Sequence, residues 1–242
     1  MEKVWVVIRS VLLVALAALV IVGAVYVFKS LEYHKAGENA EKYLEYDNVV
    51  VVDNGTSRIL FDGPGTDKAL LFFQGFQVEG AAYAPLLHSL AAEGVDCILV
   101  KMPLREAHLA EFLAGYIIRN YDYETWYIAG HGSGALAASE WASRNPDKVE
   151  GVIMLGGYAE ADLHEVSRAA IIIGTLDSVT DQEAMADAMR YLPDSAEVLG
   201  IQGGNYSQFA DIELMKGDTE ATISAEEQWK QTVNLMLSVI EK

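Results

Sequence analysis

The chain has 242 residues, with 17 basic side chains against 35 acidic ones and a formal net charge of −18 at pH 7. An acid excess of this size argues against nucleic-acid binding, which needs basic patches, and gives no attraction to anionic lipid. The single cysteine, Cys97, excludes an internal disulfide, and its apolar neighbours in "VDCILV" predict a small buried side chain.

The N-terminal segment is too apolar to belong to a water-soluble fold. Residues 11–28, "VLLVALAALVIVGAVYVF", carry no charge, and a helix of that length spans about 27 Å, close to the roughly 30 Å of a hydrocarbon core. A cleaved signal peptide is the alternative, but "VGAVYVFKS" matches its small-x-small cleavage site poorly. We predict a single-pass anchor of a cell membrane in residues 1–30, contacting the bilayer through residues 11–28. Basic residues nearly balance across the run, and the favoured orientation leaves the domain extracytoplasmic.

The rest of the chain divides into a stalk and one domain. Residues 31–46 are polar and helix-prone, which indicates a stalk, and residues 47–242 suit one domain with a sizeable core. Beyond residue 35 the chain carries 13 basic and 33 acidic side chains, so this part is more acidic than the whole.

Short apolar runs alternate with amphipathic stretches through this domain. The runs predict strands over residues 49–53, 58–61, 69–73, 97–100, 126–130, 151–155, 169–174 and 196–201. The stretches predict helices over residues 82–94, 108–121, 135–145, 182–193 and 225–242, the last with Ser224 and Glu227 at capping-box spacing. This order predicts an α/β fold: a doubly wound, mainly parallel eight-stranded sheet that binds ligands at the carboxyl ends of its strands.

The junction "YIAGHGSGAL" runs from a predicted strand through a glycine-rich turn into a predicted helix. One enzyme fold mounts its nucleophile at such a junction, in the frame G-x-S-x-G, where the residues two before and two after the nucleophile must be small. Here the frame closes on Gly130 and Gly134, and its centre is Gly132. Centred on Ser133, the frame would include the bulky His131, so it belongs to Gly132.

Four segments resemble successive landmarks of the α/β-hydrolase fold: "LLFFQGFQVEGAAYAPLLHSLAAEGVDCILVKMP", "IAGHGSGA", "IIIGTLD" and "IQGGNYSQF". The likeness is to its small dienelactone-hydrolase-like bacterial members, often membrane-anchored, and covers about residues 47–242. It implies hydrolysis of carboxylic esters or lactones without a metal or cofactor. It also implies a nucleophile after strand five, an acid after strand seven and a histidine after strand eight.

Carried over residue by residue, two of these three positions are substituted. The acid position falls on Asp177, but the nucleophile position falls on Gly132 and the histidine position on Tyr206. A serine hydroxyl needs an adjacent base, and tyrosine is mostly protonated at neutral pH. Loss of a triad serine or histidine costs on the order of 10⁶ in turnover in a studied hydrolase. No histidine follows Asp177, because the five lie at positions 34, 88, 108, 131 and 164.

The resemblance also implies an oxyanion loop after strand three and a crevice beside the elbow. The loop falls on Gln74, Gly75 and Phe76, and the second backbone donor would be the N–H of Ser133. The implied crevice is lined by Gln74–Gln77, His131–Ser133, Asp177 and Tyr206. Only about ten residues separate the sixth and seventh strands, which leaves no room for a sizeable lid.

Plainer roles remain open for the same side chains. Ser133 can be a first-turn residue whose hydroxyl satisfies helix N–H groups, and His131 can pack beside the turn. Asp177 alone can be a turn residue, and Tyr206 can pack against the sheet edge. His88 and His108 are expected to face solvent or lie in loops.

A second motif overlaps the elbow. "GHGSGA" fits the dinucleotide-binding pattern G-x-G-x-x-A. That pattern normally opens the fold and is followed by an acid at the end of the next strand. Here the next strand ends in "MLGGY", and Glu150 stands at its start, so we favour the hydrolase elbow.

Two functions follow from these residues. The first is a membrane-anchored, catalytically degenerate hydrolase that binds a small molecule in the former catalytic crevice or acts as a scaffold. The alternative is an active hydrolase of small esters or lactones that uses Ser133, His131 and Asp177 in a non-standard arrangement.

Overall fold

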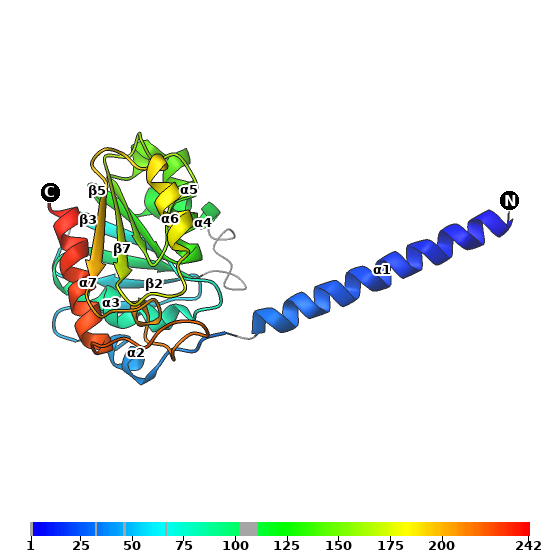
Figure 1. Ribbon diagram of the computed structural model, residues 1–242, viewed down its shortest axis with the longest axis horizontal. Coiled ribbons are helices and arrows are strands. Elements are labelled where there is room, and N and C mark those ends of the chain that lie inside the picture. The colour runs from blue at the N-terminus through cyan, green and yellow to red at the C-terminus, as the bar shows by residue number, and fades with distance from the viewer. Residues whose placement is uncertain (1, 32, 46, 66, 102–110) are drawn as a thin grey trace. The chain divides into compact units, whose positions relative to one another are not determined.

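The computed structural model describes residues 2–31, 33–45, 47–65, 67–101 and 111–242. It divides into two compact units, residues 1–33 and 34–242 (Figure 1). The first unit contains helix α1 (Glu2–Leu31), within which Ile8–Val25 is long and apolar enough to cross a membrane and is not buried. A signal sequence has the same length and composition, so α1 supports a membrane span only weakly. The predicted position of His108 lies outside the described residues.

The second unit is built on one eight-stranded sheet, as the sequence predicts. Its strand order is β1-β2-β4-β3-β5-β6-β7-β8, antiparallel between β1, β2 and β4 and parallel from there on. The strands are β1 (Val51–Asn54), β2 (Arg58–Asp62), β3 (Lys68–Phe73), β4 (Asp96–Val100), β5 (Thr125–His131), β6 (Gly151–Leu155), β7 (Arg168–Gly174) and β8 (Glu197–Ile201).

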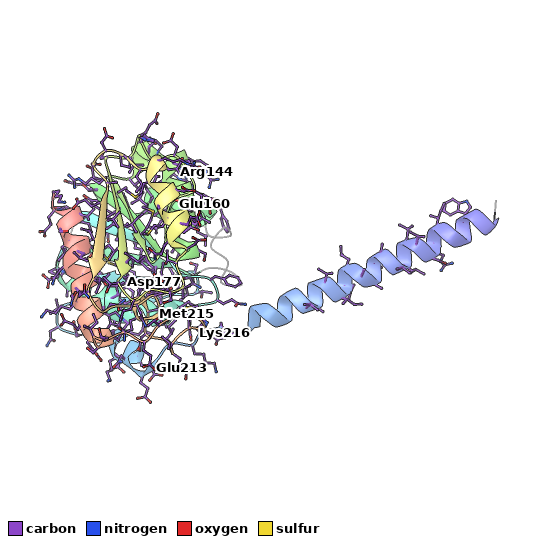
Figure 2. The ribbon with its side chains drawn as sticks, in the orientation of Figure 1. Arg144, Glu160, Asp177, Glu213, Met215 and Lys216 are labelled. Atoms are coloured by element: carbon purple, nitrogen blue, oxygen red, sulfur yellow. The ribbon has the colours of Figure 1, made fainter. Side chains whose placement is uncertain are left out.

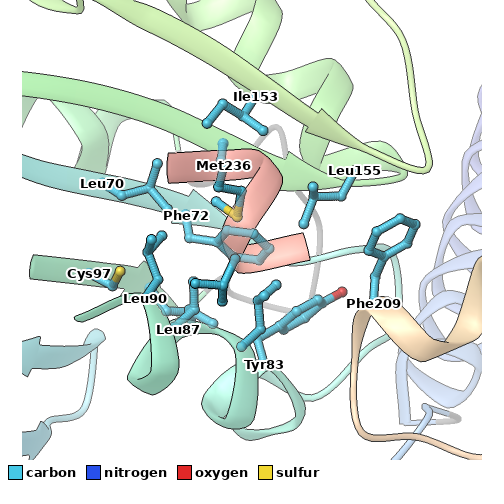
Figure 3. Packing of buried hydrophobic residues seen from close by; sticks show 14 of the residues in the cluster. Leu70, Phe72, Tyr83, Leu87, Leu90, Cys97, Ile153, Leu155, Phe209 and Met236 are labelled. Carbon is cyan, nitrogen blue, oxygen red and sulfur yellow. The ribbon is translucent and has the colours of Figure 1, made fainter. Parts of the chain in front are cut away.

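Helices cover both faces of this sheet, because each central strand is apolar on both sides. Alternate residues of a strand point to opposite faces, so Leu70 and Phe72 of β3 join one buried cluster while Leu71 and Phe73 join the other. The first cluster lies against α2, α3 and α7, and Figure 3 shows Phe72 beside Met236 of α7. The second cluster lies against α4 and α5.

The helices agree with the predicted stretches but end sooner. They are α2 (Glu38–Tyr43), α3 (Ala84–Ala92), α4 (Glu111–Asn120), α5 (Ser133–Arg144), α6 (Gln182–Ala188) and α7 (Ala225–Ile240). Single 3₁₀ turns are η1 (Gly80–Tyr83), η4 (Pro146–Lys148), η5 (Met189–Tyr191) and η6 (Ser207–Phe209). The predicted cap of α7 is present, since the Ser224 hydroxyl accepts a hydrogen bond from the Glu227 N–H at 3.2 Å. Residues 156–167 join β6 to β7 without a helix or strand, so no lid is inserted there.

Two expectations about individual regions are wrong. His88 does not face solvent: it lies buried on α3, with the Tyr43 ring edge-on at 5.3 Å between centroids. The segment 31–46 is not a separate stalk, because the compact unit already begins at residue 34. A polar helical composition cannot distinguish a stalk from a surface helix with one buried face, and α2 buries Ala40 completely.

The segment that replaces the predicted stalk is bonded to the loop after β3. The His34 N–H donates to the Gln77 carbonyl at 2.8 Å, and the Glu79 N–H donates to the His34 carbonyl at 3.0 Å. The Asp211 carboxylate accepts the Ala40 N–H at 2.8 Å. These bonds tie residues 34–40 to the loop after β3 and to Asp211.

We expect Asp211→Ala to lower the free energy of unfolding by about 1–3 kcal/mol, because the buried start of α2 loses its charged acceptor. Urea unfolding of the full chain in a non-ionic detergent measures this loss. Glu213→Ala is the matched control, since Glu213 is exposed (Figure 2). Equal stability of the two variants would contradict a structural role for this contact.

Candidate functional site

The site is built on the sharp turn between β5 and α5. Gly132 adopts φ +54° and ψ −116°, a backbone conformation that L side chains rarely adopt. A Cβ at Gly130 would fall within 3.0 Å of the Gly134 backbone, and a Cβ at Gly134 would fall within 3.0 Å of the Phe73 carbonyl. The turn therefore needs small residues two before and two after Gly132, which is the steric pattern of a nucleophile elbow.

The Tyr206 side chain fills the space above this elbow. A Cβ built on Gly132 would lie well under 3.0 Å from the Tyr206 hydroxyl and 3.1 Å from its Cζ atom. Tyr206 is 8% exposed, and its ring lies against the His131 ring at 4.2 Å between centroids, tilted by 41°. The residue at the histidine position thus occupies the volume that a side chain at the nucleophile position would need.

His131 is held in a buried hydrogen-bond chain. The Gly75 N–H donates to the Tyr83 hydroxyl at 2.9 Å, and this hydroxyl lies 2.9 Å from His131 Nδ1. All three groups are satisfied when Tyr83 donates to Nδ1, which leaves the His131 proton on Nε2. Nε2 is buried and makes no hydrogen bond of ordinary geometry with the described residues.

Burial makes His131 a poor base. Removal from water lowers the pKa of His131 from 6.5 to about 3, and the Tyr206 backbone and the Asp218 carboxylate oppose this only weakly. The ring is fully buried, as the packing role left open for it requires.

The loop at the oxyanion position is also engaged in other contacts. The Gly75 N–H, the expected donor, is already bonded to Tyr83. The Gln74 side chain turns inward, where its Nε2 donates to the Val78 carbonyl at 3.0 Å, while Phe76 is half exposed and Gln77 has φ +52°. An oxyanion hole at Gly75 would first require the Tyr83 hydroxyl to leave.

Ser133 does not have the capping role expected of it. Its hydroxyl is buried and has no hydrogen-bond partner among the described residues, and no side chain caps α5. The residue begins the helix directly after Gly132, so its backbone N–H belongs to the free first turn of α5. A lone buried hydroxyl next to helix N–H groups is suited to meeting a polar atom of a ligand.

Asp177 lies in the loop beyond the end of β7 (Figure 2). Its Oδ1 accepts the N–H groups of Val179 and Thr180 at 2.8 Å, and its Oδ2 accepts the Thr180 hydroxyl at 2.6 Å. The carboxylate therefore organises its own loop. Burial first, and then the charges of Asp177 and Asp218, raise the pKa of Tyr206, so its hydroxyl stays protonated.

A cavity of about 240 Å³ opens beside the elbow, lined by Gly132, Ser133, Leu136, Gly156, Gly157, Tyr158, Glu160, Val179, Thr180, Asp181 and Tyr206. Of the residues named for the implied crevice, Gly132, Ser133 and Tyr206 line this cavity, whereas Gln74–Gln77, His131 and Asp177 do not. The loop after β3 closes against Tyr83 instead. Tyr158, Glu160 and Asp181 were missed because no motif marks the loops after β6 and β7.

Other candidate chemistry finds little support in the described residues. Cys97 is buried mid-sheet on β4, and burial raises the pKa of its thiol. Glu150 lies before β6, at the end of the strand opposite to the one a ribose-binding acid would need. No three His, Cys, Asp or Glu side chains of the described residues gather as metal ligands do.

The chain is similar to one curated protein in sequence and to many solved structures in fold. The chain is 25% identical over 209 residues to the "Putative non-heme haloperoxidase" of Mycobacterium phage D29, covering 75% of this chain and 74% of that protein. Est1E from Butyrivibrio proteoclasticus superimposes with a TM-score of 0.57 at 13% identity, covering 81% of this chain and 100% of Est1E. A monoacylglycerol lipase from Paleococcus ferrophilus gives 0.56 at 14% identity, with coverages of 78% and 99%.

The family assignment rests on the sequence. The family model described as "Alpha/beta hydrolase family" matches residues 69–230, which is most of the second unit. The solved structures, at so low an identity, agree with this in fold. The chain therefore belongs to the alpha/beta hydrolase family.

Proposed function

We propose that this protein is a catalytically degenerate α/β hydrolase that binds a small molecule non-covalently beside the elbow. One observation carries the proposal: the Tyr206 hydroxyl occupies the space above Gly132 where a nucleophilic side chain would stand. A tyrosine whose pKa is raised is a hydrogen-bond donor and not a base. Tyr206 lines the cavity beside the elbow, so a ligand there can lie against this side chain without any covalent step.

The alternative is an active hydrolase that uses Ser133, His131 and Asp177. Three observations argue against this alternative. No hydrogen bond joins the buried Ser133 hydroxyl to His131, whose Nδ1 faces Tyr83 instead. The pKa of His131 is about 3, far below the range useful for a general base near neutral pH. The Asp177 carboxylate is bonded to Val179 and Thr180 and not to a histidine.

The proposed place of action is the surface of a membrane. We propose that α1 is retained as a single-pass anchor through residues 11–28, with the second unit on the extracytoplasmic side. The length and composition of α1 support the anchor, and the poor cleavage site favours its retention over removal as a signal peptide.

A serine-directed probe tests the proposed function. We expect the full chain in non-ionic detergent to show no more fluorophosphonate labelling than Ser133→Ala, and p-nitrophenyl acetate hydrolysis equal to that of the same variant. The reason is that neither a base nor a free oxyanion donor faces the Ser133 hydroxyl. Specific labelling at Ser133, or ester turnover that Ser133→Ala abolishes, would overturn the proposal in favour of the active hydrolase.

A further inference from the structure

Two hydroxyl-bearing residues, Tyr206 and Ser133, line the cavity at the elbow. Tyr206 is 8% exposed. The buried Ser133 hydroxyl has no hydrogen-bond partner among the described residues and lies at the start of α5. A helix N-terminus and a tyrosine hydroxyl that stays protonated both favour an oxygen acceptor.

The charges around the Tyr206 hydroxyl disfavour an anionic acceptor. Asp177 and Asp218 both act on the Tyr206 hydroxyl and help to raise its pKa. A carboxylate or phosphate placed there would meet the same two negative charges, in a chain whose net charge is already −18. The acceptor that fits is therefore neutral, such as an ester or amide carbonyl.

The same cavity also carries two carboxylates and an aromatic ring. Glu160 and Asp181 line it together with Tyr158. Burial first, and then the charges of Glu160 and Asp181, raise the pKa of Tyr158. Glu160 has no hydrogen bond or ion pair with the described residues, and Asp181 uses only one oxygen to cap α6.

A second cavity adjoins the first. It has a volume of about 330 Å³, shares Tyr158 and Glu160 with the first and adds Asp187 and Arg190 of the α6–η5 segment. Arg190 is the cation that could compete for these acids. Its guanidinium instead lies over the Tyr191 ring at 4.8 Å and donates to the Tyr191 hydroxyl at 3.0 Å.

We propose that the cavity binds a small organic ammonium compound, with its cationic end between Glu160, Asp181 and the Tyr158 ring and a neutral carbonyl oxygen on the Tyr206 hydroxyl. Carboxylates and an aromatic face are the groups that attract organic ammonium ions. The volume of about 240 Å³ suits a ligand of small size. This inference rests on the proposed function, because it requires a ligand that is bound and not hydrolysed.

Calorimetric titration with two isosteres tests the charge preference. Acetylcholine carries an ammonium and an ester carbonyl, and 3,3-dimethylbutyl acetate has the same shape without the charge. At low ionic strength we expect the full chain in non-ionic detergent to bind acetylcholine about tenfold more tightly than the neutral isostere. Levulinate, which joins a ketone to a carboxylate, should not bind measurably.

Variants assign the preference to the named side chains. Glu160→Gln should weaken acetylcholine binding about 3- to 10-fold and leave binding of the neutral isostere unchanged, because only the charge is removed. Tyr206→Phe should weaken both compounds, since it removes the donor to the carbonyl. Glu165→Gln is the matched control: this exposed acid lies in the same β6–β7 loop but does not line the cavity, and should change neither affinity.

Each outcome bears on one of the two proposals. No binding of acetylcholine at millimolar concentration, or equal affinity for the two isosteres, overturns the inference about the cation. An unchanged affinity in Glu160→Gln, with folding verified by circular dichroism, overturns it as well. Release of acetate from acetylcholine by the native chain, absent in Ser133→Ala, would instead overturn the proposed non-catalytic function.

Discussion

Gly132→Ser is expected to lower the free energy of unfolding by about 2–4 kcal/mol. A Cβ at this position would lie well under 3.0 Å from the Tyr206 hydroxyl, and the new side chain must also adopt φ +54°. Overpacking of a filled site and a left-handed backbone each cost on the order of 1–3 kcal/mol. Urea unfolding of the full chain measures the loss.

Tyr206→His should recover part of that loss when the two substitutions are combined, because the shorter imidazole withdraws from the space above Gly132. We expect a coupling free energy of about 1–2 kcal/mol in the double-mutant cycle. Gly200→Ser is the control, since a Cβ there would meet only Thr175 Cγ2, at 3.8 Å. Additive effects of Gly132→Ser and Tyr206→His would show that the side chains at these two positions do not compete for the same space.

The same double variant tests whether the site is that of a hydrolase that has lost its nucleophile and base. Gly132→Ser with Tyr206→His restores a nucleophile and a base at the positions the hydrolase resemblance assigns, so slow fluorophosphonate labelling should appear at residue 132 in the double variant only. We expect the reaction to remain slow, because the Gly75 N–H is bonded to Tyr83 and the Asp177 carboxylate is bonded to its own loop. Labelling of either single variant at residue 132 would contradict the need for both changes.

The buried histidine is expected to make stability depend strongly on pH. The pKa of His131 is about 3 in the folded chain and about 6.5 in the unfolded chain. Between these values the unfolded state binds a proton that the folded state does not, so stability is lost as pH falls from about 6.5 toward 3. The slope is about 1.4 kcal/mol per pH unit for this one group, and the loss reaches about 4 kcal/mol over the window.

A variant isolates this contribution from the other titrating groups. Asparagine at residue 131 keeps an acceptor for the Tyr83 hydroxyl but does not titrate, so His131→Asn should reduce the slope between pH 5 and 6.5 by about one proton. A slope that is the same in the native chain and in His131→Asn would show that His131 takes up its proton in the folded state.

The agreement between sequence and structure is greatest where local pattern decides the outcome. The apolar runs that became β3 to β7 are buried on both faces, and such runs identify parallel strands without knowledge of their neighbours. The elbow was equally readable, because the small residues at Gly130 and Gly134 are required by contacts within a few residues. The start of the compact unit was missed, because α2 is held by partners such as Asp211 that lie far along the chain.

The sequence by itself determined the fold class, the strand order along the chain, the acidic charge and the absence of a histidine after Asp177. Only the tertiary structure decided that Tyr206 fills the space above Gly132, that Tyr83 takes the Gly75 N–H, and that Glu160, Asp181 and Tyr158 line one cavity. Periodicity reports how a residue sits on its own strand or helix, whereas a site joins the ends of several strands. Its contacts depend on side-chain directions in loops, which no repeating pattern specifies.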